Sequence, residues 1–151
     1  MARVPVADQA ANRGRAGLLS TLWIFAVLNY LYCDVLGHMD GAVLAELLRG
    51  EAGGMRITQG FLLGAGVLME VPIAMVLLAR VLPQRVNRWA NIAAAAVMTA
   101  AQAGSLLVGT PTGYYVLYSV IELACTVFIM GYAWTWRPVR SAAPVPVGAA
   151  R

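Results

Sequence analysis

The sequence has no lysine, one histidine and two cysteines. Two cysteines are too few for a disulfide framework, and both Cys33 and Cys125 fall inside apolar segments. We therefore expect them to behave as small buried hydrophobic residues. His38 has neither a second histidine nor a ligating cysteine near it, so no metal site is expected.

Motifs that carry common enzyme chemistry are also missing. We find no nucleophile elbow, phosphate-binding loop, dinucleotide fingerprint or zinc-protease motif, which leaves nucleotide-driven and nucleophilic chemistry without support. No cofactor is expected. The formal net charge is +4, but the arginines are scattered around apolar blocks instead of gathering on one segment, so nucleic acid is not an expected partner.

Apolar residues dominate what is present. Hydrophobic residues make up 60% of the 151 residues, and the mean hydropathy is +0.70. A soluble domain of this size is far less apolar, so we expect an integral membrane protein whose main partner is the lipid bilayer.

Four apolar runs are each long enough to cross a hydrocarbon core of about 30 Å as a helix. They predict an all-α fold, an integral membrane four-helix bundle with antiparallel, up-down-up-down topology. The expected spans are residues 18–36, 57–80, 89–108 and 114–136, within a transmembrane domain of residues 17–136. Residues 1–16 are expected to form a mobile cytoplasmic tail and residues 137–151 a disordered one.

A polar stretch separates the first two spans. Within it, Asp40 is placed to cap a short helix in which Val43, Leu44, Leu47 and Leu48 recur at helical spacing. This pattern predicts a short amphipathic helix at the membrane interface. Gly50, Gly53 and Gly54 follow and should form a hinge.

The arginines predict the orientation. Nine of the 11 arginines lie in the two tails, in the connection between the second and third spans or, as Arg80, at the adjoining end of the second span, so both termini should be cytoplasmic. The absence of lysine and the abundance of alanine, glycine and valine suggest a bacterial source, and hence the bacterial inner (plasma) membrane.

Three carboxylates fall inside the predicted spans. Glu70 lies near the middle of the second span, two residues before Pro72, which cannot donate the usual backbone hydrogen bond. Asp34 lies near the outer end of the first span and Glu122 in the outer half of the fourth. Ionisable groups at membrane depth usually face a bundle interior or a water-filled cavity, so these three are the candidate proton-exchanging groups.

Polar and aromatic residues accompany these carboxylates at helical spacing. The simplest arrangement that hides them from lipid is an outward-opening, aromatic-walled pocket with Glu70 as its floor and Asp34 at its mouth. Its expected ligand-binding residues are Trp23, Tyr30, Asp34, Gln59, Glu70, Gln102, Tyr115, Tyr118 and Glu122. A different reading fits Gln59, Asn91 and Gln102 as well, because interhelical hydrogen bonds can simply hold such helices together.

Several blocks of the sequence resemble a family of small bacterial membrane proteins of unknown function with four spans. They are LSTLWIFAVLNYLYCDVLGHMD, ITQGFLLGAGVLMEVPIAMVLL, RVNRWANI and YYVLYSVIELACTVFIMGYAW. The resemblance extends over roughly residues 18–136, and in size and hydropathy the chain is similar to the DoxX-like proteins. Because the family is uncharacterised, the resemblance implies a fold and no activity.

Three functions remain open. The leading hypothesis is proton-linked binding or transport of a small molecule or cation, which would require a homo-oligomer because four helices are few for alternating access. The second is a membrane-embedded acid–base enzyme, such as an isomerase or cyclase acting on a lipophilic substrate. The third is an accessory or structural membrane subunit.

Overall fold

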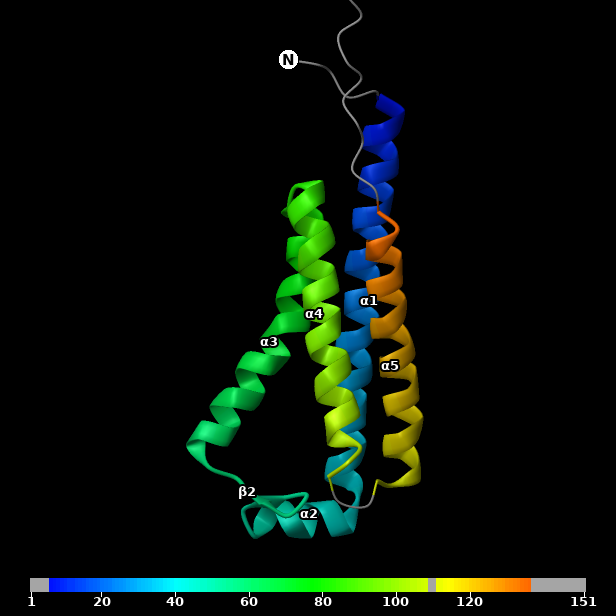
Figure 1. The fold of residues 1–151 in the computed structure, drawn as a ribbon. Coiled ribbons are helices and arrows are strands. Elements are labelled where there is room, and N and C mark those ends of the chain that lie inside the picture. Colours follow the sequence, from blue (N-terminus) through cyan, green and yellow to red (C-terminus); the bar gives the residue numbers. More distant parts are fainter. Residues whose placement is uncertain (1–5, 109–110, 137–151) are drawn as a thin grey trace, which may run out of the picture.

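The structure, a computed structural model, describes residues 6–108 and 111–136 (Figure 1). These residues are mostly helical, as the sequence predicted. Their elements are α1 (Val6–Met39), α2 (Gly41–Leu48), β1 (Glu51–Ala52), β2 (Met55–Arg56), α3 (Gln59–Val81), α4 (Gln84–Ser105) and α5 (Gly113–Trp134).

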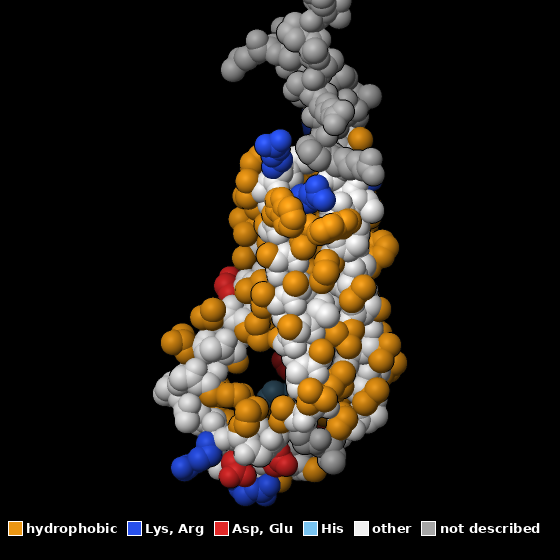
Figure 2. Space-filling view, viewed as in Figure 1, with side chains coloured by type: hydrophobic (Ala, Val, Ile, Leu, Met, Phe, Trp, Pro, Cys, Tyr) orange, Lys and Arg blue, Asp and Glu red, His pale blue; other side chains and the backbone are white. Residues whose placement is uncertain are grey.

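Three helices in the described part of the chain are long and apolar enough to cross a membrane: Gln9–Met39, Gln59–Val81 and Gly113–Trp134. The fourth predicted span corresponds to α4, which falls short of that hydropathy because its first two turns carry Arg85, Asn87, Arg88 and Asn91. Figure 2 shows hydrophobic side chains over the sides of the molecule and arginine at its two ends, a distribution that fits a membrane protein.

The long helices alternate in direction along the chain (Figure 1), and α5 packs against both α1 and α4. Where they meet, alanines and a few large side chains fill the core, because small residues let helix backbones approach closely. The buried cluster contains Leu19, Trp23, Ala26, Tyr30, Met75, Ala79, Ala94, Ala95, Met98, Cys125, Ile129 and Trp136.

Helix α3 packs against α1 and α4 through its second half only. Pro72, Met75 and Ala79 are buried, whereas residues 59–67 are all exposed. Figure 1 shows α3 beside α4 at one end and diverging from it toward α2, and Figure 2 shows the molecule hollowed there. The expected compact four-helix bundle is therefore only partly formed. Pro72 interrupts the hydrogen bonding of α3 at the point where the helix leaves its neighbours.

The first helix is longer than expected. It begins at Val6, so much of the predicted mobile tail is helical. This extension is held by α5, because Asn12 accepts a hydrogen bond from the Trp136 indole at 2.9 Å. The Arg15 guanidinium also lies 5.0 Å from the centre of the Tyr132 ring. The predicted tail of residues 137–151 lies outside the described residues.

The segment between α1 and α3 contains the predicted short helix. Asp40 caps α2 by accepting a hydrogen bond from the backbone N–H of Ala42 at 2.9 Å. The expected glycine hinge is instead a two-stranded hairpin in which Glu51 pairs with Arg56. Gly53 has a φ of +55°, and a Cβ there would meet Val108 Cγ1 at 3.0 Å, so the turn needs glycine.

Candidate functional site

The most deeply buried carboxylate of the described residues is Glu122. Its side chain is 1% exposed and lies on the face of α5 that packs against α1 and α4. That face is a helical stripe of Ser119, Glu122, Cys125, Thr126, Ile129 and Ala133. Ser119, three residues before Glu122, and Thr126, four residues after it, are small polar residues on the same face of α5. All three side chains therefore turn inward together.

Glu122 Oε1 is buried and has no hydrogen-bond partner among the described residues. The same is true of the Tyr30 hydroxyl on α1, whose side chain is 7% exposed. Tyr30 lies on the buried face of α1 and Glu122 on the buried face of α5, and these two helices pack against each other. A buried polar atom without a partner is costly, so this pair forms the candidate site.

Two buried thiols flank the pair. Cys33 and Cys125 are both free and buried, as the sequence predicted, and both lie within electrostatic range of Glu122 or Tyr30. Cys125 Sγ points at the Leu22 carbonyl at 3.7 Å. The described residues contain no group of three or more His, Cys, Asp or Glu side chains that could hold a metal ion.

Other polar residues predicted for the pocket instead join α4 to α5. Gln102 donates to Ser119 Oγ at 2.7 Å, and the Tyr115 hydroxyl donates to Ser105 Oγ at 2.7 Å. These bonds fit the alternative in which such groups hold helices together. Gln102 still reaches the neighbourhood of Glu122, since Ser119 lies one turn from it on α5.

Trp23, another residue predicted for the pocket, forms its hydrogen bond with α4 and not with Glu122. Its indole N–H donates to Asn91 Oδ1 at 2.8 Å, Asn91 donates to Asn87 Oδ1 at 2.7 Å, and Asn87 donates to the Ala79 carbonyl at 2.6 Å. This buried chain of hydrogen bonds links α1, α4 and α3. The sequence correctly predicted that Trp23 and Tyr30 turn into the protein, but it did not reveal that Asn91 is the hydrogen-bond partner of Trp23.

Glu70 and Gln59 do not join the site. Both are exposed on α3 in the single chain, so the expected pocket floor at Glu70 is not formed. Asp34 is exposed at the rim and Tyr118 is half-buried on α5. The structure thus buries Tyr30 and Glu122 in one interior, leaves Asp34 exposed one turn after Tyr30 on α1, and closes the protein around the Glu122 carboxylate where an open pocket was expected.

The residues that sequence reasoning missed at this site are Ser119 and Cys33. Ser119 lies three residues before Glu122, a spacing that could have placed it on the same face. Cys125 lies three residues after Glu122, a spacing that places both on one face of α5, but nothing in the sequence related Cys33 to Glu122, because that depends on how α1 and α5 are rotated against each other.

Comparison with known proteins identifies the family of the chain. A model of a family of unknown function, DUF6326, matches residues 9–143. The chain belongs to this family. The match includes every helix described here except the first turn of α1, so DUF6326 membership applies to the whole helical domain. The expected similarity to DoxX-like proteins is not confirmed. Neither the curated proteins nor the solved structures gave a match.

Proposed function

We propose that this DUF6326 protein crosses the bacterial inner membrane four times, with α1, α3, α4 and α5 as the spans and both termini in the cytoplasm. The connections support this, because only Leu82 and Pro83 separate α3 from α4. Helix α4 must therefore start on the side where α3 ends. Its 22 residues rise about 33 Å, enough to return to the other side, where α5 begins.

The burial of α4 also supports a fourth span. Its polar residues Asn87 and Asn91 are turned into the protein and hydrogen-bonded, while Val86 and Val97 are exposed. A helix of low average hydropathy can cross a bilayer in this way, since its polar groups meet protein and its apolar groups meet lipid.

We infer that the protein binds a small cation at Glu122 in exchange for a proton. The observation that carries this inference is the buried, unpartnered Oε1 of Glu122. An ionised carboxylate without a partner costs several kcal/mol in such surroundings, so the group must hold either a proton or a cation. The Tyr30 hydroxyl, also unpartnered, supplies a second oxygen ligand.

Asp34 has a different role in this proposal. It is exposed on α1, one turn after Tyr30 and toward the α2 end of the helices, so in this proposal it lies between the buried carboxylate and the aqueous surface at that end. A cation that approaches from that side meets Asp34 first and Glu122 second. Binding requires the side chains around Glu122 to move, because the carboxylate is closed from solvent.

Proton release measures the exchange. The full chain, purified in a mild detergent and held in weak buffer, is titrated with sodium, potassium or tetramethylammonium chloride while a dye reports pH. We expect one of these cations to release about one proton per chain, because ligands that bind cations must first lose their protons. Glu122→Gln should abolish the release.

Glu70→Gln is the matched control. It neutralises another carboxylate within the long helices, and because Glu70 is exposed on α3 and takes no part in the Glu122 site, proton release should stay unchanged. Release that persists in Glu122→Gln, or its absence with all three cations in the wild type, would contradict the proposal.

An acid–base enzyme is the second candidate, and the juxtaposition of the Tyr30 hydroxyl and the Glu122 carboxyl favours it. One group could donate a proton to a lipophilic substrate while the other removes one. In that case a lipid-soluble compound would be converted without any ion gradient. A purely structural role explains the hydrogen-bonded pairs of α4 and α5, but it leaves Glu122 Oε1 unexplained.

A further inference from the structure

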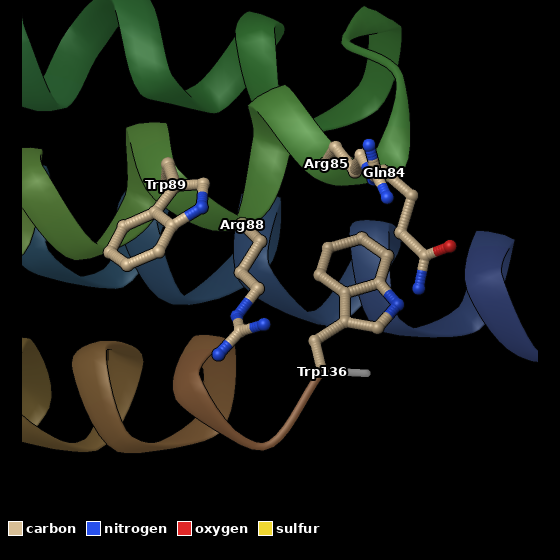
Figure 3. Close-up of a pocket in the computed structure, with 5 residues that line it drawn as sticks. All are labelled: Gln84, Arg85, Arg88, Trp89 and Trp136. Carbon is tan, nitrogen blue, oxygen red and sulfur yellow. The ribbon is translucent and has the colours of Figure 1, made fainter. Parts of the chain in front are cut away.

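A cavity of about 230 Å³ lies at the end of the helices opposite α2 (Figure 3). The first two turns of α4 and Trp136, two residues past the end of α5, line it. Its lining combines cationic and aromatic side chains: Gln84, Arg85, Arg88, Trp89 and Trp136. No function proposed above uses these residues.

Arg88 is the most constrained cation of this cavity. Its guanidinium carbon lies 5.5 Å from the centre of the Trp89 ring and 5.7 Å from that of Trp134. Its Nε is buried and makes no hydrogen bond within the described residues. The rings hold the guanidinium in place by cation–π attraction but leave its donors without an acceptor.

Within the part of the chain that the structure describes, neither Arg85 nor Arg88 has a hydrogen bond or ion pair with a carboxylate. Residues 71–121, which include all of α4, contain no Asp or Glu. Two guanidinium groups therefore line one cavity with their positive charge available to a ligand.

The start of α4 adds to the field. Its N-cap is Pro83, which makes no side-chain hydrogen bond to the first turn, and that turn has no acidic residue. The first backbone N–H groups of α4 thus lack the usual carboxylate or hydroxyl acceptor. A helix N-terminus in this state attracts anions.

The aromatic residues indicate the depth of the cavity. Trp89 and Trp134 are 58% and 59% exposed, and their rings meet edge to face with centroids 6.2 Å apart. Exposed tryptophans at the end of membrane-crossing helices lie at the level of the lipid headgroups. Trp136 forms an inner wall, since its indole is fixed by Asn12.

We propose that this cavity binds a phosphate group, of the kind that an anionic phospholipid presents at the membrane surface. Guanidinium groups recognise phosphate oxygens through paired, charge-assisted hydrogen bonds. Basic pockets between helices on the cytoplasmic side suit such headgroups. The site is independent of Glu122 and of the exchange proposed there.

Thermal unfolding of the full chain tests the site. The midpoint temperature is measured in detergent micelles, in micelles mixed with phosphatidylglycerol or phosphatidylcholine, and in micelles with inorganic phosphate against chloride at equal ionic strength. We expect phosphatidylglycerol to raise the midpoint and phosphatidylcholine to leave it nearly unchanged. Arg88→Gln should lose most of the increase.

Two further variants keep the result interpretable. Arg85→Gln changes an exposed side chain with no partner, so it should fold normally and also lose much of the increase. Arg49→Gln removes an exposed arginine at the opposite end, after α2, and should keep the full increase.

The outcomes separate the source of the phosphate. An Arg88-dependent increase with phosphatidylglycerol alone identifies a lipid headgroup, and the same increase with inorganic phosphate identifies a soluble ligand; both support the site. The proposal is overturned if neither raises the midpoint, if both cavity variants keep the wild-type increase, or if Arg49→Gln loses as much as they do.

Discussion

Buried polar side chains of this protein differ in whether they have a partner. Trp23, Asn91 and Asn87 form an unbroken series of hydrogen bonds, whereas Glu122 and Tyr30 lie in the same interior with unpartnered oxygens. A satisfied group stabilises the helix packing, and an unsatisfied one is available to a ligand. Buried polar residues that look alike in the sequence can therefore be separated by their hydrogen bonds: the partnered ones are structural, and the unpartnered ones are candidates for function.

Removal of the Trp23 indole N–H should destabilise the fold. Trp23→Phe leaves Asn91 Oδ1 buried without its donor, and the smaller ring leaves a gap in the core. We expect a loss of about 1–2 kcal/mol in the free energy of unfolding, measured by thermal or chemical denaturation in detergent.

Tyr32→Phe serves as the control for Trp23→Phe. Tyr32 is exposed on the same helix, so loss of its hydroxyl should change stability by less than about 0.5 kcal/mol. Equal effects of the two substitutions would show that the buried hydrogen bond contributes nothing measurable.

Some of this could be predicted from single residues and some could not. Asp40 and the spacing of the leucines after it predicted α2 and its cap, because capping depends on neighbours in the chain. The bond between Gln102 and Ser119 depends on how α4 and α5 are rotated against each other. The sequence offered an interhelical hydrogen bond as one role for Gln102, but no pattern within one helix contains that rotation, so its partner Ser119 could not be predicted.

At the scale of elements, α3 departs most from expectation. Its limits agree with the predicted span to within two residues, because hydropathy and the N-cap Thr58 are local signals. Its placement was not predictable, since its first half diverges from α4 toward α2 (Figure 1). Glu70 is exposed while its neighbours Met69 and Val71 are half-buried, so it lies on the outer face of α3.

Helix α4 supports a direct test of the proposed topology. Arg85 lies near its start and Leu107, which is 87% exposed, lies just past its end. We expect Leu107→Cys to react with a membrane-impermeant maleimide in intact cells, and Arg85→Cys to react only after the membrane is opened. The wild-type chain gives little background, because its two thiols are buried.

The opposite pattern of labelling would reverse the proposed orientation. Reaction of both variants from the same side would place α4 on the membrane surface instead of across the bilayer.

At the scale of the whole molecule, the single chain leaves a carboxylate uncovered. Glu70 is exposed about halfway along α3, a helix apolar enough to cross the bilayer. A carboxylate that faces lipid at that depth is unfavourable, so we expect a second copy of the chain to cover it. Native mass spectrometry of the wild type in a mild detergent should show a dimer or larger assembly.

Glu70→Leu should shift that assembly toward single chains, because leucine is well accommodated by lipid. Glu51→Leu, in the hairpin outside the long helices, should leave the assembly unchanged. A wild-type protein that is monomeric in both detergent and lipid nanodiscs would contradict the expectation.

The half-packed state of α3 also bears on how the protein must be handled. Residues 59–67 have no side chain buried against the rest of the chain, so packing does little to keep them helical. In a bilayer their backbone hydrogen bonds persist because there is no water to replace them. A detergent shell that admits water removes this protection, and the first half of α3 should then fray while α1, α4 and α5 stay folded. Extraction conditions thus determine which form of the protein an experiment observes.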